Sequence, residues 1–391
     1  MYIALLLSFF PLSTLAITIP LSTSGASFID ATGTKFNYAG VNWPGHMGAM
    51  IPEGLQYQSI ASIVQSIKKL NMNVVRFTYS TQMVDEAITG TVDAKSGVLK
   101  ALGEKNGAPI WAKIVEKNRF PEGVTRLQIF DKVAEELGKA GILVHLDNHI
   151  SKAMWCCGGN DGNAWFGDRD FDTERWIRGW KFMANHTKSW PTLASYGLRN
   201  ELRSPDGNAN LKSTYNWDVW TRHVKNAAQT VNRENPNAII FLSGLGFDTD
   251  FSIVTNGKFK KEEWPTKKTA LELHRYDDKK NNIKECSGFA SSLDRSGWGA
   301  MKLESSKAMP VVMTEFGFAQ DGKAFQTPYA QCLKTYFKQN KAGWIYWVLS
   351  GSYYDRSGKQ DSDEEWGLLK HDWSDVRDNR TISDYIMKLS R

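Results

Sequence analysis

Short apolar runs alternate with longer amphipathic stretches along most of the chain. Eight runs are apolar enough to be strands buried on both faces: Phe36–Val41, Val74–Thr78, Ile142–Leu146, Tyr196–Leu198, Ile239–Ser243, Ala270–His274, Val311–Thr314 and Trp344–Leu349. Apolar residues recur at three-to-four spacing in four stretches between them, which predicts helices over Leu55–Leu70, Thr125–Gly141, Asp218–Asn232 and Ala330–Lys341. This alternation predicts an α/β protein, a closed (β/α)8 TIM barrel, as a single domain over residues 17–391.

The first 16 residues differ from the rest of the chain. They carry no charge, and a short apolar run is followed by small residues that end at Ala16. This pattern predicts a secretory signal peptide over residues 1–16, so the protein is expected to be secreted and extracellular. The run is too short to span a bilayer, and no membrane partner is expected. In a secreted chain the sequons at Asn185 and Asn379 predict glycosylation.

Composition narrows the class of protein. The 391 residues are 41% hydrophobic and 12% aromatic, which is too apolar for a disordered chain. The net charge of +6 comes from 48 basic and 42 acidic residues, which are scattered along the chain and form no long run of like charge. No nucleic-acid partner is therefore expected.

Four cysteines occur, and an even number in a secreted chain favours disulfides. We expect Cys286 to pair with Cys332, because consecutive units of a barrel are neighbours. Cys156 and Cys157 would then be free or joined as a vicinal bridge. The competing connectivity sends one of them to Cys286 across the barrel mouth.

Polar or aromatic residues stand at the ends of seven of the predicted strands. They are Asn42 and Trp43, Arg76, Asp147 and His149, Asn200 and Glu201, His274 and Tyr276, Glu315, and Trp347. In a TIM barrel the carboxyl ends of the strands meet on the catalytic face. These residues are therefore expected to form one site.

Glu201 and Glu315 end predicted strands four and seven, from which two side chains can face each other across the mouth. Two carboxylates about a shared space suit glycoside hydrolysis, where one donates a proton and the other attacks or activates water. Arg76 is expected to lower the pKa of Glu315, and ionised Glu315 to raise that of Glu201. A retaining pair should lie about 5–5.5 Å apart.

The segments NVVRFTY, HLDNH, GLRNEL, LELHRY, VMTEFGF and WIYWVLSG follow the order of known strand-end motifs. In these segments the chain resembles glycoside hydrolase family 5 of the clan A barrels, over roughly residues 37–373. It is most similar to secreted cellulase-like members of fungi and plants, through its MWCC, NELR and GSYY segments. One departure is that Leu202 and Arg203 follow Asn-Glu, where many cellulases have proline.

The resemblance implies roles for eight residues. Glu201 would be the general acid/base and Glu315 the nucleophile of a retaining double displacement. The resemblance also implies that Asn200 would hydrogen-bond the sugar 2-hydroxyl, and that Arg76 and Tyr276 would hold the nucleophile ionised and oriented. The subsite at the cleavage point would be lined by His149, His274 and Trp347.

Three patterns allow a second interpretation. His145, Asp147 and His149 alternate on one strand face, which can indicate a metal site, but a core hydrogen-bond network is preferred. Loop tryptophans can stack on sugars or simply pack; they are Trp43, Trp155, Trp165 and Trp366. The segment Cys156–Gly167 is either a lid or a surface loop.

The sequence thus predicts a secreted, monomeric, retaining hydrolase of β-linked glycosides that uses no cofactor and no metal. Its carbohydrate substrate would be a β-glucan, a β-mannan or a β-glucoside. One alternative is a catalytically silent glycan-binding protein on the same barrel, and another is a metal-dependent barrel hydrolase. The intact pair Glu201 and Glu315, with its supporting residues, favours the glycosidase.

Overall fold

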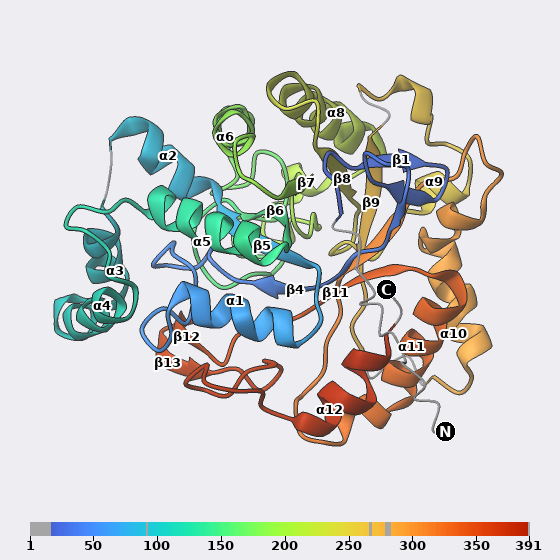
Figure 1. The fold of residues 1–391 in the computed structure, drawn as a ribbon. Helices are drawn as coiled ribbons and strands as arrows, with labels where there is room; N and C mark the ends of the chain where they lie inside the picture. Colours follow the sequence, from blue (N-terminus) through green and yellow to red (C-terminus); the bar gives the residue numbers. More distant parts are fainter. Residues whose placement is uncertain (1–16, 91–92, 266–267, 278–282, 390–391) are drawn as a thin grey trace, which may run out of the picture.

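A closed barrel of eight parallel strands forms the centre of the computed structural model (Figure 1). The structure describes residues 17–90, 93–265, 268–277 and 283–389, so the predicted signal peptide lies outside the described residues. The barrel strands are β4 (Ala39–Trp43), β5 (Val74–Ser80), β6 (Leu143–Ile150), β7 (Leu193–Gly197), β8 (Ile239–Ser243), β9 (Thr269–His274), β10 (Val311–Glu315) and β11 (Gly343–Tyr346). They pair in this order, and β11 closes the ring on β4. The predicted (β/α)8 barrel is confirmed.

Helices surround this barrel (Figure 1). The longer ones are α1 (Ile60–Lys69), α2 (Thr81–Thr89), α3 (Ala94–Leu102), α4 (Glu104–Asn118), α5 (Arg126–Ala140), α6 (Thr173–Thr187), α8 (Trp217–Glu234), α10 (Cys286–Arg295) and α11 (Pro328–Asn340). Shorter ones are α7 (Ala209–Lys212), α9 (Ser252–Thr255) and α12 (Asn379–Asp384), with 3-10 turns at Lys261–Glu263, Trp298–Lys302, Ala324–Gln326 and Ile386–Lys388. No helix in the described part of the chain is both long and apolar enough to cross a membrane.

Local sequence explains where these helices begin and end. In α5 the Thr125 side chain accepts from the backbone of Gln128, whose side chain bonds back to Thr125. This reciprocal capping box satisfies two donors at the helix start. The helix ends at Gly141 with φ 71°, a left-handed conformation that glycine adopts without steric cost. The predicted boundaries of this helix therefore hold to within one residue.

Three predicted boundaries are wrong by three residues or more at their amino-terminal ends, and the simplest is strand β7, which begins at Leu193 rather than Tyr196. Phe36 is not in the first barrel strand but pairs with Phe28 in a small antiparallel sheet of β1 (Ser22–Ser24), β2 (Ser27–Ile29) and β3 (Lys35–Phe36). Its ring packs into an apolar cluster with Phe28, so its burial reflects this separate contact. The helix expected from Leu55 begins at Ile60, because Ser59 caps it and the preceding residues form turns.

The last predicted strand is too long at its carboxyl end. Strand β11 stops at Tyr346, and Trp347 to Leu349 lie outside the strand, although the Leu349 amide still donates to the Asn42 carbonyl of β4 at 3.0 Å. Next comes a hairpin that the periodicity did not predict, β12 (Ser352–Arg356) and β13 (Lys359–Asp363). Figure 1 shows it below α1, and the Gln360 side chain donates to the Leu102 carbonyl of α3 at 2.8 Å.

The four cysteines form two disulfides. Cys286, the first residue of α10, is joined to Cys332 of α11, with 4.9 Å between the Cα atoms. This is the expected pairing of neighbouring barrel units. Cys156 and Cys157 are joined to each other, which is the vicinal alternative. The connectivity across the mouth is not formed.

Candidate active site

The predicted site residues converge at the carboxyl ends of the barrel strands. Glu315 ends β10, while Asn200 and Glu201 follow β7. They line one cavity of about 440 Å³, within the size range of small-molecule sites. His149, Tyr276 and Trp347 line the same cavity. Arg76 and His274 lie beneath it, buried and in contact with Glu315.

Glu315 is held by charged and polar partners on both oxygens. Arg76 Nη1 donates to Oε1 at 2.6 Å, and the Tyr276 hydroxyl donates to Oε2 at 2.8 Å. His274 Nδ1 lies 3.6 Å from Oε2. These contacts fix the orientation of the carboxylate, and its side chain is only 5% exposed.

Glu201 faces Glu315 from a constrained backbone. Its φ of 47° is left-handed, a conformation that costs a non-glycine residue about 1–3 kcal/mol. The Glu201 amide donates to Asp248 Oδ2 at 2.9 Å, which holds this conformation. His274 Nδ1 lies 3.0 Å from Glu201 Oε1. One carboxylate oxygen from each glutamate and a His274 nitrogen all lie within 4.8 Å of one another.

Arg76 is the centre of a buried polar network. Its guanidinium lies 3.0 Å from Asp147 Oδ1 and 3.7 Å from Glu272 Oε2, and it also donates to the side-chain oxygens of Asn42 and Asn200. Burial alone would lower the pKa of Arg76, but the carboxylates of Asp147, Glu315 and Glu272 raise it. Arg76 therefore stays charged beside Glu315.

Burial is the main influence on the pKa of both glutamates, an effect that the sequence did not predict. Burial raises the pKa of Glu201 to about 7, against the opposing charges of Arg203 and Arg76. Burial also raises the pKa of Glu315, and His274 and Arg76 only partly oppose this effect. Arg76 lowers the pKa of Glu315 as expected, but the net shift is upward, because removing the carboxylate from water outweighs the charges of His274 and Arg76.

His145, Asp147 and His149 belong to the hydrogen-bond network of the barrel. His149 Nδ1 lies 2.7 Å from Asp147 Oδ2, and His145 Nδ1 lies 2.8 Å from the Ser195 hydroxyl. All three side chains are buried in β6. These contacts agree with the preferred core-network interpretation.

Among the described residues, two groups have donor atoms close enough to hold a metal ion. One is the glutamate pair with His274, and the other is Cys156 and Cys157 with Glu201. In the first group every residue already has a hydrogen-bonding partner within the site. The two cysteines are joined to each other, so they offer no thiolate.

Aromatic rings form part of the cavity wall. Trp347 stacks on His149 with ring centroids 5.5 Å apart, and Trp366 lies 5.6 Å from Tyr276. Trp155 also lines the cavity. Trp43 and Trp165 do not, because both are fully buried and their indole nitrogens bond within the protein. Of the four loop tryptophans, two are thus placed for sugar contact.

Several cavity residues were not predicted. Arg356, Asp363, Glu364 and Glu365 come from the hairpin and the segment after it. Only the run Asp-Ser-Asp-Glu-Glu marked this segment, and an acidic run is normally a solvated surface. Cys156 and Cys157 form the wall beside Asn200, whose amide nitrogen lies 3.8 and 3.6 Å from their sulfurs.

Arg203 follows Asn200, Glu201 and Leu202, in the segment where many cellulases have Asn-Glu-Pro, and its side chain has a structural role here. Its side chain donates to the Gly158 carbonyl at 2.9 Å and pairs with Asp161 at 2.6 Å. It also donates to the Glu201 carbonyl at 2.7 Å. Arg203 therefore joins the loop after β6 to the segment that carries Glu201.

Comparison with known proteins agrees with this arrangement. A family model described as cellulase (glycosyl hydrolase family 5) matches residues 29–352. A glycosyl hydrolase 5 family protein of Chamaecyparis obtusa is 33% identical over 383 residues, which are 94% of this chain and 65% of the relative. An endoglucanase of Paenibacillus polymyxa is 26% identical over 57% of this chain and 49% of the relative. The chain thus spans less than two thirds of either relative.

Solved structures share the fold at low sequence identity. The catalytic domain of the major endoglucanase from Xanthomonas campestris pv. campestris is similar with a TM-score of 0.70 and 19% identity, covering 94% of this chain and 99% of that one. A Pyrococcus horikoshii endocellulase in complex with cellotetraose has a TM-score of 0.70 and 20% identity, covering 95% and 98%. At such identities the likeness shows the barrel fold alone.

Proposed function

Because the chain belongs to glycosyl hydrolase family 5, we propose that it hydrolyses β-linked glycosides by a retaining double displacement. Glu315 is the nucleophile and Glu201 the general acid/base. The observation that carries this proposal is the pair of carboxylate oxygens within 4.8 Å of each other in one cavity. Inverting enzymes keep their carboxyl groups about 6.5–9.5 Å apart to admit a water, whereas retaining pairs lie about 5–5.5 Å apart.

In the first step, a Glu315 oxygen attacks the anomeric carbon while Glu201 gives its proton to the departing glycosidic oxygen. The products of this step are a glycosyl ester on Glu315 and a free leaving alcohol. In the second step, ionised Glu201 takes a proton from water, and the water oxygen displaces Glu315 from the same carbon. Two inversions restore the β configuration and return both glutamates to their starting states.

The surrounding residues support this division of roles. Arg76 and Tyr276 each donate to Glu315, which favours its ionised form and aims its oxygens. Glu201 has a pKa of about 7 and so retains a proton to donate in weakly acidic solution. Asn200 reaches the same cavity beside Glu201, where its amide can bind the sugar 2-hydroxyl.

A β-glucan, a β-mannan or a β-glucoside is the proposed substrate class. Two of the similar proteins are endoglucanases by name, which favours β-glucosyl units. Residues 17–391 would act as one secreted catalytic domain, as one relative is named a major extracellular endoglucanase. Asn185 and Asn379 are exposed, as glycosylation of both sequons requires. Activity across a panel of defined aryl β-glycosides identifies the sugar.

The stereochemistry of the first product tests the mechanism. We expect the sugar released by the protein to have the β configuration before mutarotation, because both displacements invert the same carbon. Proton NMR of the anomeric signals during the first minutes of hydrolysis measures this. If the α anomer accumulates first, the retaining proposal is wrong.

The pH profile tests the proton assignments. We expect kcat/KM to fall as pH rises through about 7, because Glu201 must be protonated in the first step. It should also fall on the acid side, at a pH above the ordinary glutamate value of 4.5, because burial raises the pKa of the nucleophile Glu315. The matched control is the pH profile of kcat/KM for Glu201→Gln on an activated aryl glycoside. In this profile the decline at alkaline pH, called the alkaline limb, should be absent. An unchanged alkaline limb in that variant contradicts the assignment to Glu201.

A further inference from the structure

Two segments that are distant in the sequence meet at one edge of the cavity. Trp155 lies in the loop after β6, and Arg356 ends β12 after the last barrel strand. The Arg356 guanidinium lies 3.8 Å from the centroid of the Trp155 ring. Trp155 also contacts Tyr353, with ring centroids 5.4 Å apart. Trp155, Tyr353 and Arg356 are called the end wall below.

The barrel order shows which side of the mouth the end wall closes. Around the ring, β4 and β5 lie between β11 and β6. A contact between the loops that follow β11 and β6 therefore passes over the ends of β4 and β5. Among the described residues, the cavity lining comes from segments after β6, β7, β9, β10 and β11, and none comes from the loops after β4 and β5. The cavity accordingly stops at the end wall.

The end wall is firmly attached to the rest of the protein. Arg356 Nη1 pairs with Glu364 Oε2 at 3.0 Å, and the Tyr353 hydroxyl donates to the same oxygen at 2.7 Å. The Tyr354 amide donates to Glu53 Oε2 at 2.7 Å, which ties the hairpin to the loop after β4. Glu53 and Glu364 are both buried. An anchored wall excludes substrate rather than moving aside.

The positions of the aromatic and catalytic residues orient the substrate against this wall. Trp347 follows β11 and stacks on His149 at the end of β6, and β4 and β5 lie between these two strands. A sugar ring that packs on this pair would lie over β4 and β5. Glu201 and Glu315 flank the opposite side, where β8 and β9 lie. A sugar ring on the Trp347 side of the two glutamates would therefore face the end wall. On the other side, after β8, Phe247 is 40% exposed.

We infer that the end wall closes the glycone side, so that the protein is an exo-acting hydrolase that removes units of one short length from the non-reducing end of a β-linked chain. This inference rests on the proposed hydrolase function and deepens it. Trp155 and Arg356 are its specificity-determining residues, because they occupy the space that further sugar units would need in an open cleft. A chain that continues past the wall would clash with them.

The test compares matched β-linked oligosaccharides with a free or a methylated 4-hydroxyl on the non-reducing terminal sugar, using the full-length protein. We expect products of a single short length from the free substrate, and at least about a tenfold lower rate on the capped substrate. Trp155→Ala and Arg356→Ala should each raise the capped-to-free rate ratio about tenfold or more, by opening the end of the cavity. Chromatography of reducing-end-labelled substrate separates exo from endo products.

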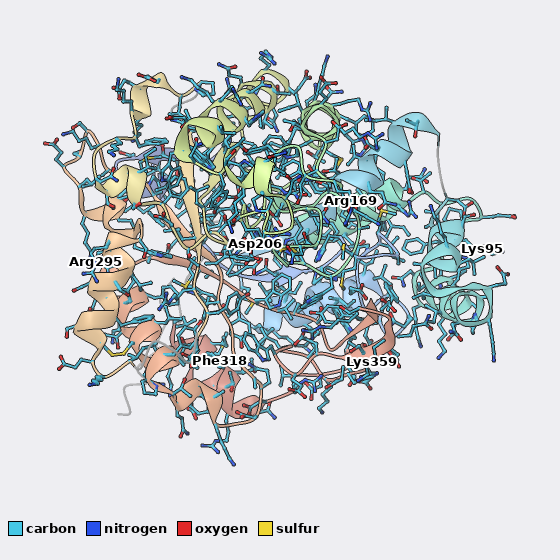
Figure 2. All side chains as sticks on the ribbon, turned by 180° about the vertical axis from the view of Figure 1, so that it is seen from behind. Lys95, Arg169, Asp206, Arg295, Phe318 and Lys359 are labelled. Atoms are coloured by element: carbon cyan, nitrogen blue, oxygen red, sulfur yellow. A yellow bond between two sulfur atoms is a disulfide. The ribbon has the colours of Figure 1, made fainter. Side chains whose placement is uncertain are left out.

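Lys359→Ala and Arg169→Ala are matched controls on the same hairpin and the same loop, and both side chains are exposed (Figure 2). They should leave the ratio unchanged, and melting temperatures identify any variant that has unfolded. Equal rates of the unmodified protein on capped and free substrates, or mixed product lengths, overturn the inference while the hydrolase function stands. No hydrolysis of any aryl β-glycoside overturns the hydrolase function itself.

Discussion

We expect Glu315→Gln to lower kcat/KM by about 10⁴-fold or more on every β-glycoside that the protein hydrolyses. Removal of a catalytic nucleophile lowers the rate by factors of this order in other enzymes. The amide keeps the size of the side chain, and Arg76 retains Asp147 and Glu272 as counter-charges. The loss therefore reflects the missing nucleophile rather than collapse of the buried network. Steady-state kinetics on an aryl glycoside and an oligosaccharide measure the effect.

Two observations keep this result interpretable. Glu304→Gln, at an exposed glutamate that does not line the cavity, is the matched control and should keep full activity. The melting temperature of Glu315→Gln should stay close to that of the unmodified protein. If Glu315→Gln retains more than about a hundredth of the activity on all substrates, Glu315 is not the nucleophile.

Glu201→Gln has an effect that depends on the leaving group. We expect a loss of about 10²–10⁴-fold on oligosaccharides and alkyl glycosides, whose leaving oxygens need a proton. Glycosides with good leaving groups, such as dinitrophenol, should keep a fast first step, because they need little proton donation. A burst of phenol followed by slow turnover is expected, since the second step still lacks its base.

Added azide separates this behaviour from general damage. A small anion can attack the glycosyl ester on Glu315 without base assistance, so azide should accelerate turnover of Glu201→Gln and yield a β-glycosyl azide. It should have no such effect on Glu315→Gln. Equal losses on activated and unactivated substrates would remove Glu201 from the acid/base role.

The barrel and the convergence of Glu201 and Glu315 could be predicted from local pattern. Strands such as Ile239–Ser243 are apolar on both faces, which only a sheet covered on both sides accommodates. Eight such strands form a ring, and a parallel ring places every carboxyl end on one face. Polar residues after these strands must then meet, whatever loops connect them.

Sites assembled from segments without periodicity could not be predicted in this way. The hairpin β12–β13 reaches Trp155 only because the chain folds back over β4 and β5 after closing the barrel. Arg356 has no local signal that distinguishes it from a surface arginine. Phe36 shows the same limit, because its apolar neighbours suggested a barrel strand while its partner lies in an amino-terminal sheet.

The sequence by itself determined the fold class, the family and the place of Glu201 and Glu315 at the barrel mouth, because these depend on hydrophobic periodicity and on residues at strand ends. The tertiary structure alone decided the proton affinities and the limits of the cavity. Burial raises the pKa of both Glu201 and Glu315, and it depends on how distant segments pack around them. The end wall likewise exists only where the loop after β6 meets the hairpin after β11. Local patterns specify which residues face the mouth, and long-range packing specifies what surrounds them there.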